Sequence, residues 1–211
     1  MENYETNRAY VTLLNNQNKE INLSGNEALG MYAKNGYIIN KGQIELSGTG
    51  STAIYGRDNT LIENTNTSKI KLNGDKSTAI YYNNTDTATT GENIENYGEI
   101  ELNGSKDTGI AYNSVSITAT NPTLVKNFAD IKINNSESIG IHSEVTQNNP
   151  YIIENQGNIT ITAQTQDKKK PTVGIHTKDD LAKIINGNNG NIKVSKNNIG
   201  IIGNSVDNQG N

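Results

Sequence analysis

Short runs in which apolar and polar residues alternate recur along this chain at a nearly regular interval. Each repeat opens with the pattern isoleucine, any residue, aliphatic residue. The isoleucines that open these runs are Ile21, Ile44, Ile70, Ile100, Ile131, Ile159 and Ile192, at intervals of 23 to 33 residues. Alternation points one side chain inward and the next outward, which indicates half-buried strands and argues against a helix with its period of about 3.6 residues.

Two further alternating runs complete each repeat. A small residue followed by an apolar one opens the second run, as in Ala53-Ile54, and the pattern aliphatic-x-Asn-x-Gly closes the repeat, as in Ile38–Gly42. Three short strands fill one coil of a parallel β-helix, whose coils stack about 4.8 Å apart. The pattern therefore predicts an all-β fold, a right-handed parallel β-helix of about seven three-strand coils. Residues 1–20 are expected to form a lead-in or partial coil, and residues 21–211 the repeats.

Stacking turns each repeat position into a column that runs along the rod. Asparagine suits a tight turn and its amide can bond the amides above and below, so the third run predicts an Asn ladder at one corner. The predicted ladder contains Asn40, Asn64, Asn96, Asn127, Asn155, Asn188 and Asn208. The glycine two residues later, such as Gly42 or Gly98, is expected to supply a positive φ there.

A second column predicts ion pairs on the outside of the rod. The outward position of the first run reads Asn22, Glu45, Lys71, Glu101, Lys132, Thr160 and Lys193 from coil to coil. Glutamate and lysine alternate over four consecutive coils, and opposite charges on neighbouring strands attract one another. These carboxylates are therefore expected to be partners of lysines and not general acids.

A third column carries outward aromatic side chains and is the leading candidate for a ligand surface. Its members are Tyr32, Tyr55 and Tyr81, followed after Ala111 by His142 and His176. Tyrosine rings can stack on sugars, while the structural alternative is that they stack on one another and shield the backbone. The two histidines lie in adjacent coils, but no third ligand recurs with them, so neither a metal site nor a cofactor is predicted.

Four longer connections interrupt the repeats, and recognition often lies in loops that a rigid scaffold carries. They span Tyr82–Asn93, Asn113–Thr123, Ser143–Pro150 and Ala163–Thr172. The last contains Lys168, Lys169 and Lys170, a basic cluster that is a further candidate for ligand contact. The alternative for any one of these loops is a solvated connection without a partner.

Composition agrees with a thin core. Hydrophobic residues are only 32% of the 211, near the level at which chains stay disordered, yet the net charge of −4 is too small to force disorder. A rod one side chain deep needs only about five inward residues per coil. The lack of cysteine excludes disulfides and thiolate sites, and two arginines with a pI near 5.3 argue against a nucleic-acid partner.

Patterns typical of catalysis are weak, and an enzyme is not predicted. A polysaccharide lyase on this fold needs a carboxylate cluster and an arginine base, yet Arg57 is the only arginine in the repeats and no neighbouring coil aligns aspartates with it. A hydrolase needs two converging carboxylates, whereas the acidic residues here alternate with lysine or lie in loops. The alternative is a carbohydrate-active β-helix enzyme, a lyase or hydrolase that depends on Asp58 or Glu154.

Several segments resemble the passenger repeats of large autotransporter adhesins, with the closest likeness to the very long fusobacterial outer-membrane adhesins. These segments are Gly109–Tyr112, Asn96–Gly104 and Ser51–Tyr55. The resemblance covers about residues 21–211 as a style of repeat and transfers no binding residue. It implies a virulence-associated, type V secreted fibre on the bacterial surface. Its role would be that of stalk and presentation scaffold in adhesion to a protein or glycan receptor on host cells or other bacteria.

The resemblance also implies a monomeric passenger whose parent chain is anchored by a C-terminal membrane barrel that this sequence does not contain. Residues Val206–Asn211 match the corner that precedes a new strand, and the chain then ends. Because solenoids normally end in a capping element, we expect a fragment truncated in mid-repeat from a longer rod. A secreted haemagglutinin-like protein or a phage fibre would also fit this style of repeat.

Overall fold

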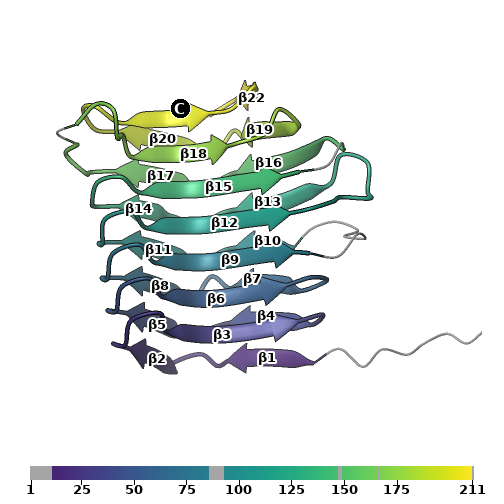
Figure 1. Cartoon of the computed structure of the whole chain (residues 1–211), viewed down its shortest axis with the longest axis vertical. Coiled ribbons are helices and arrows are strands. Elements are labelled where there is room, and N and C mark those ends of the chain that lie inside the picture. The colour runs from purple at the N-terminus through teal and green to yellow at the C-terminus, as the bar shows by residue number, and fades with distance from the viewer. Residues whose placement is uncertain (1–10, 86–92, 147–148, 166, 211) are drawn as a thin grey trace, which may run out of the picture.

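The structure is a computed structural model that describes residues 11–85, 93–146, 149–165 and 167–210. These residues form 22 strands, which stack as coils from the N-terminal end at the bottom of Figure 1 to the C-terminal end at the top. The fold is the right-handed parallel β-helix that the repeats predict. Among the described residues there is no helix long and apolar enough to cross a membrane.

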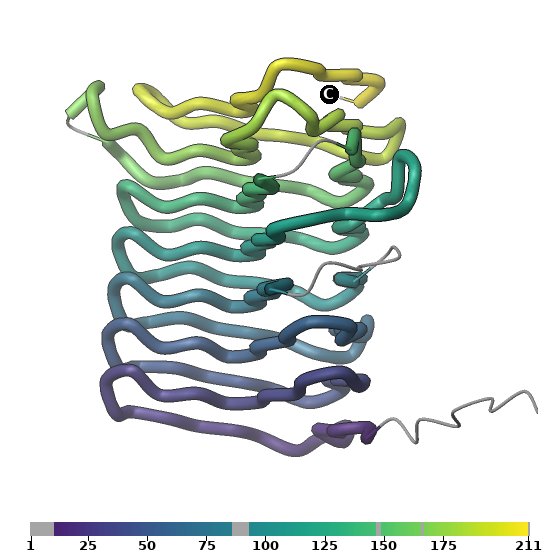
Figure 2. The backbone as a smooth tube through the Cα atoms, turned by 45° about the vertical axis from the view of Figure 1, so that its right-hand side comes forward, coloured from purple at the N-terminus to yellow at the C-terminus, as the bar shows by residue number. Residues whose placement is uncertain are grey.

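Each coil contributes one strand to each of three parallel sheets, and the backbone trace in Figure 2 shows the coils as successive rungs. Sheet A contains β1 (Thr12–Asn15), β4 (Tyr37–Asn40), β7 (Leu61–Asn64), β10 (Ile94–Asn96), β13 (Thr123–Asn127), β16 (Tyr151–Asn155), β19 (Ala182–Asn186) and β22 (Ser205–Asn208). Sheet B contains β2 (Glu20–Leu23), β5 (Gln43–Leu46), β8 (Lys69–Leu72), β11 (Glu99–Leu102), β14 (Ile131–Ile133), β17 (Asn158–Ile161) and β20 (Asn191–Val194). Sheet C contains β3 (Leu29–Lys34), β6 (Thr52–Arg57), β9 (Thr78–Asn84), β12 (Thr108–Ser114), β15 (Ile139–Val145), β18 (Val173–Thr177) and β21 (Ile199–Ile202).

Inward aliphatic residues set the register because they lie directly above one another. In sheet B, Ile44 pairs with Ile70 and Ile70 with Ile100, and in sheet C Ile54 pairs with Ile80. All five are at most 1% exposed. Each buried side chain of this size contributes about 1.5–3 kcal/mol, and a shift of one residue would turn a whole strand's set outward. The columns therefore fix how each coil sits on the next.

Sheet C differs from the sequence-based expectation because its strands are longer. β9, β12 and β15 extend into the segments predicted as the loops 82–93, 113–123 and 143–150, so those loop boundaries are wrong. Tyr82 and Tyr112 point inward, are fully buried and stack with their ring centroids 4.8 Å apart. This tyrosine pair carries the core past the isoleucine columns towards the corner between sheets C and A. Residues 86–92, 147–148 and 166 of the predicted loops lie outside the described residues.

The corner glycines have a role that differs from the predicted one. Gly50 is the one glycine with positive φ among the described residues, so Gly42 and Gly98 do not supply a left-handed turn. They are needed for space instead, since a Cβ on Gly42 would lie 2.2 Å from the Lys19 carbonyl oxygen. Positive φ occurs at the corner before sheet C, where Lys76 (φ 58°) stands one coil above Gly50 (φ 70°).

Candidate functional site

The aromatic column lies on the outer face of sheet C, in the register that the sequence predicts. From β3 to β21 it reads Tyr32, Tyr55, Tyr81, Ala111, His142, His176 and Ile202. The ring centroids of Tyr32 and Tyr55 are 5.3 Å apart, and those of Tyr55 and Tyr81 are 5.0 Å apart with the rings only 19° from parallel. Tyr55 and Tyr81 thus stack on one another along the rod, whereas the rings of Tyr32 and Tyr55 are tilted by 50°. Tyr32 is the most open of them, with 44% of its surface exposed.

Tyr81 is held more firmly than the other two tyrosines. Its hydroxyl accepts a hydrogen bond from the Asn113 amide at 3.3 Å. Burial raises the pKa of Tyr81 above its ordinary value, so the phenol stays protonated at neutral pH. A ligand that contacted Tyr81 would therefore meet a neutral hydroxyl.

The histidine pair continues the same column two coils further along. The rings of His142 and His176 have centroids 5.1 Å apart. Burial first, and then the neighbouring His176, lower the pKa of His142, so its imidazole is neutral at physiological pH. The described part of the chain contains no group of three or more His, Cys, Asp or Glu side chains that could hold a metal ion.

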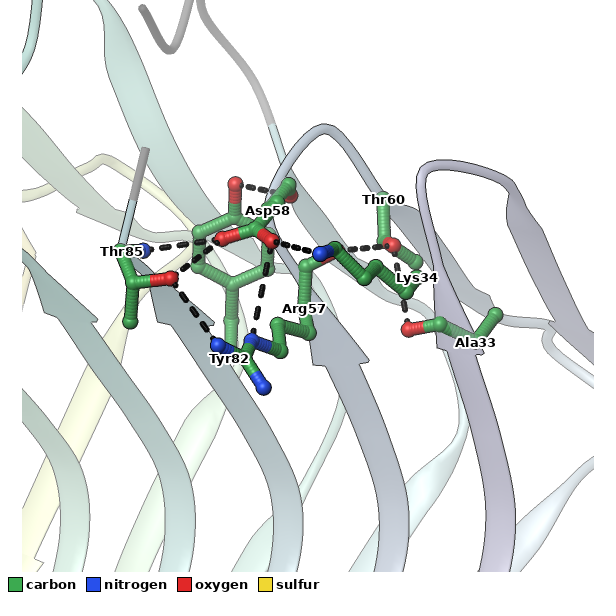
Figure 3. A network of polar contacts seen from close by, with 7 residues as sticks. All are labelled: Ala33, Lys34, Arg57, Asp58, Thr60, Tyr82 and Thr85. Carbon is green, nitrogen blue, oxygen red and sulfur yellow. Dashed lines mark hydrogen bonds and ion pairs between the residues drawn. The ribbon is translucent and has the colours of Figure 1, made fainter. Parts of the chain in front are cut away.

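A buried carboxylate lies where β6 turns into the corner between sheets C and A (Figure 3). Asp58 has a φ of 52°, and its side chain accepts hydrogen bonds from the Thr85 backbone N–H (3.0 Å) and hydroxyl (2.9 Å). The Lys34 ammonium is 3.3 Å away and Arg57 Nε is 3.6 Å away. The backbone carbonyl oxygen of Asp58 accepts a hydrogen bond from the buried Tyr82 hydroxyl at 2.5 Å.

These contacts join Asp58 to Lys34 of the preceding coil and to Thr85 of the following coil. Burial alone would raise the pKa of Asp58, but the hydrogen bonds from Thr85 and the charge of Lys34 outweigh burial and lower it. Arg57 also donates to the Thr85 hydroxyl at 3.3 Å, so the arginine is engaged in holding the next coil. Glu154, the other carboxylate considered for catalysis, belongs to a different coil and accepts a hydrogen bond from Gln156 at 2.9 Å. The two carboxylates do not converge.

The cluster Lys168–Lys170 lies away from the tyrosine column. Lys168 and Lys169 are exposed in the turn before β18, and Lys170 Nζ lies 3.9 Å from Glu137 Oε2. This turn belongs to the coil of His176, at the corner between sheets B and C. Lys34 and Arg57, which flank the tyrosines, stand at the other end of the sheet C strands.

The Asn ladder is present, with one correction and one addition. Each side-chain amide donates to the amide oxygen of the next coil at 2.7–2.8 Å, through Asn15, Asn40, Asn64, Asn96, Asn127, Asn155, Asn186 and Asn208. The prediction of Asn188 is wrong, because Ile184 stacks on Ile153 and thereby places Asn186 above Asn155. Asn188 lies in an exposed turn. The ladder begins one coil earlier than predicted, at Asn15.

Ion pairs line the outer face of sheet B, but only partly in the predicted combinations. Lys71 lies 3.8 Å from Glu45 as expected, whereas Lys132 pairs with Glu99 at 2.5 Å. Glu99 also pairs with Lys69 at 2.7 Å. The lysine ammoniums hold the pKa of Glu99 below its ordinary value. These carboxylates are ionised partners of lysine.

A family model described as the BigA third pectate lyase-like domain matches residues 2–126, more than half of the chain. The chain belongs to this family. BigA is an autotransporter-like adhesin, so the relationship is to a passenger domain, and the words pectate lyase-like describe the fold. No curated protein and no solved structure matches the chain.

One feature of this BigA-type domain was missed by sequence reasoning: a row of hydroxyls at the corner between sheets B and C. Ser51, Ser77 and Ser138 each accept a backbone N–H from the coil before and donate to a glycine carbonyl oxygen. Asp107 takes the same position between Ser77 and Ser138. Its Oδ1 accepts the Ser77 N–H at 2.9 Å, while its buried Oδ2 has no hydrogen-bond partner among the described residues. The signal was present in the sequence as a serine column with one aspartate.

Proposed function

We propose that this chain is a rigid, non-catalytic segment of a bacterial surface adhesin, which spaces and presents binding surfaces away from the cell. The observation that carries the proposal is the pairing of each coil with the next in three parallel sheets, with a register shift in sheet A at Thr123–Val125, in a domain of the BigA family. Because every coil is tied to the next by paired strands, the Asn ladder and stacked isoleucines, the rod resists bending and local unfolding. These are properties that a stalk requires.

The finer assignment rests on repeat style. An Asn- and Ile-rich, cysteine-free sequence supports a passenger of the fusobacterial type, exported by type V secretion and displayed at the outer membrane. In this proposal the parent chain supplies the membrane barrel, and a protein or glycan on host cells or other bacteria is the receptor. The passenger acts as a monomer.

The surface that best suits receptor contact is the outer face of sheet C. Tyr32 is exposed and Tyr55 is half-buried, with Lys34 and Arg57 two residues further along the same strands. Aromatic and arginine side chains are enriched where proteins bind partners. The basic turn at Lys168–Lys170 is a second, separate surface.

The test is adherence of the purified, labelled protein to bacterial and host cells and to a glycan array. Tyr32→Ser with Tyr55→Ser is expected to abolish adherence, and Lys71→Gln on the outer face of sheet B is the matched control. If adherence survives the two tyrosine substitutions, the outer face of sheet C is not the surface that contacts the receptor. Turnover of a polysaccharide that is lost in Asp58→Asn or Glu154→Gln would contradict the non-catalytic assignment.

A further inference from the structure

A groove of about 390 Å³ lies on the outer face of sheet A, away from the tyrosine column. It is lined by Tyr37, Ile38, Ile39, Leu61, Ile62, Glu63, Asn93 and Glu95 from β4, β7 and the start of β10. Its exposed lining is mainly apolar. The volume is near the lower end of the range of about 300–1,000 Å³ that is usual for ligand sites, which suits a few side chains.

The groove exists because one outward side chain is missing from a column. In β4 and β7 the outward position holds Tyr37 and Leu61, which lie in register. One coil further on, Asn93 occupies the equivalent place, but its side chain turns inward. Its amide donates to the Thr60 carbonyl oxygen at 3.3 Å and its Oδ1 accepts from the buried Tyr112 hydroxyl at 3.1 Å. No described residue therefore covers the apolar surface of Leu61 on that side, and the side chain is 42% exposed.

Carboxylates stand beside this apolar floor. The next outward column runs from Ile39 to Glu63 and Glu95. Glu63 is exposed and makes no ion pair with any described residue, whereas Glu95 lies 3.7 Å from Lys126 and accepts a hydrogen bond from the Tyr97 hydroxyl. Among the described residues, this edge of the groove thus carries the carboxylates of Glu63 and Glu95, and Lys126 lies beside only the second of them. An uncompensated carboxylate next to apolar surface attracts a cation that brings its own apolar stem.

We infer that this groove binds an extended segment of a partner protein in which a lysine or arginine stands beside a large apolar side chain. The apolar side chain packs on Tyr37 and Leu61, and the ammonium or guanidinium group meets Glu63. Lysine and arginine stems are themselves apolar, so they can follow the floor while their heads reach the carboxylate. The interaction is independent of adhesion through sheet C.

The experiment titrates the full chain into two fluorescein-labelled short peptides and follows anisotropy. One peptide holds two lysines beside a leucine and a phenylalanine, and the other replaces the lysines with glutamates. We expect saturable binding of the basic peptide that weakens with salt, and no binding of the acidic one. Equal binding of both peptides, or binding of neither, would overturn the proposal.

Variants locate the site. Leu61→Ser is expected to weaken binding of the basic peptide by about tenfold or more, the effect of losing one large apolar contact. Leu29→Ser is the matched control, because Leu29 is 45% exposed but lies on sheet C. Glu63→Gln should weaken binding several-fold and Glu63→Lys should abolish it, with the melting temperature of each variant unchanged.

Two results would refute this placement. An equal loss of affinity in Leu29→Ser and Leu61→Ser would mean that the peptide binds apolar surface without selecting the groove. Sedimentation that shows concentration-dependent dimers, lost in Leu61→Ser, would make a second copy of the chain the occupant instead of a basic partner segment.

Discussion

Asp107 is expected to make the rod less stable as the pH rises from about 4 to about 7, and replacing it with serine should remove that effect. The neighbouring serines in its column both accept a backbone N–H and donate a hydroxyl proton to a glycine carbonyl oxygen. An ionised carboxylate can accept but has no proton to donate. Asp107 is 0% exposed, and its Oδ2 has no hydrogen-bond partner among the described residues.

The size of this loss in the free energy of unfolding follows from the shift in the pKa of Asp107. Burial raises the pKa of Asp107 from 3.8 to about 7, against the lowering effect of the hydrogen bond from the Ser77 backbone N–H, and the charge of Asp75 adds to the rise. The folded state therefore holds a proton that the unfolded state releases near pH 4. Its contribution to stability is complete below about pH 4 and is lost as the pH rises to about 7. The whole span is worth about 4 kcal/mol, at about 1.4 kcal/mol for each unit of pKa.

Urea denaturation followed by circular dichroism at pH 5, 7 and 8.5 measures this effect. The wild-type chain should lose stability over this range, while Asp107→Ser should show a smaller loss and be the more stable protein at pH 8.5. Asn188→Ala, at an exposed residue that does not titrate, is the control and should leave the pH dependence unchanged. A wild-type pH profile that Asp107→Ser does not alter, or a serine variant less stable than wild type at pH 8.5, would refute the argument.

Three further predictions use the same assay. Asn96→Ala leaves the Asn64 amide and the Asn127 oxygen buried without their partner and should cost about 3 kcal/mol, whereas Asn188→Ala should change stability by less than about 0.5 kcal/mol; similar losses in both would contradict the corrected ladder. The lowered pKa of His142 means that its contribution is present above about pH 6.5 and is lost as the pH falls, so His142→Gln should flatten the acid side of the stability profile; an unchanged acid side would count against it. Lys76→Gly should stabilise the chain by up to about 1 kcal/mol, because Lys76 has a positive φ at the position that Gly50 holds one coil below; a loss of stability would show that its side chain matters more than its backbone.

The repeat pattern determined the fold because a β-helix has one repeating unit. Ile44, Ile70 and Ile100 must all point inward, and a strand shifted by one residue would expose every such side chain, so the register is already present in the alternation of residues. The aromatic column was predictable for the same reason. Once the coils are in register, Tyr32, Tyr55 and Tyr81 must lie directly above one another.

The corners and the departures from the repeat were not predictable in this way. Asn188-x-Gly190 fits the spacing of a ladder corner better than Asn186 does, and only the packing of Ile184 on Ile153 decides between them. Tyr82 and Tyr112 each follow an outward residue, and one opens a predicted loop while the other directly precedes one. Both nevertheless lie in the core, because there is room for their rings at the end of sheet C. Such choices depend on how much room one coil leaves for the next, which no single repeat encodes.

The sequence by itself determined the solenoid, its three faces and most of the columns, since alternation and period are local properties that every coil repeats. Tertiary structure decided which polar groups are buried without a partner, as at Asp107, and which surfaces stay open, as at Leu61 beside the inward-turned Asn93. The physical reason is that burial and hydrogen bonding of a side chain depend on the residues one coil above and below. Those neighbours lie 22 residues away in the chain at the pair Ile184–Val206 and 34 at the pair His142–His176, so the separation varies from coil to coil.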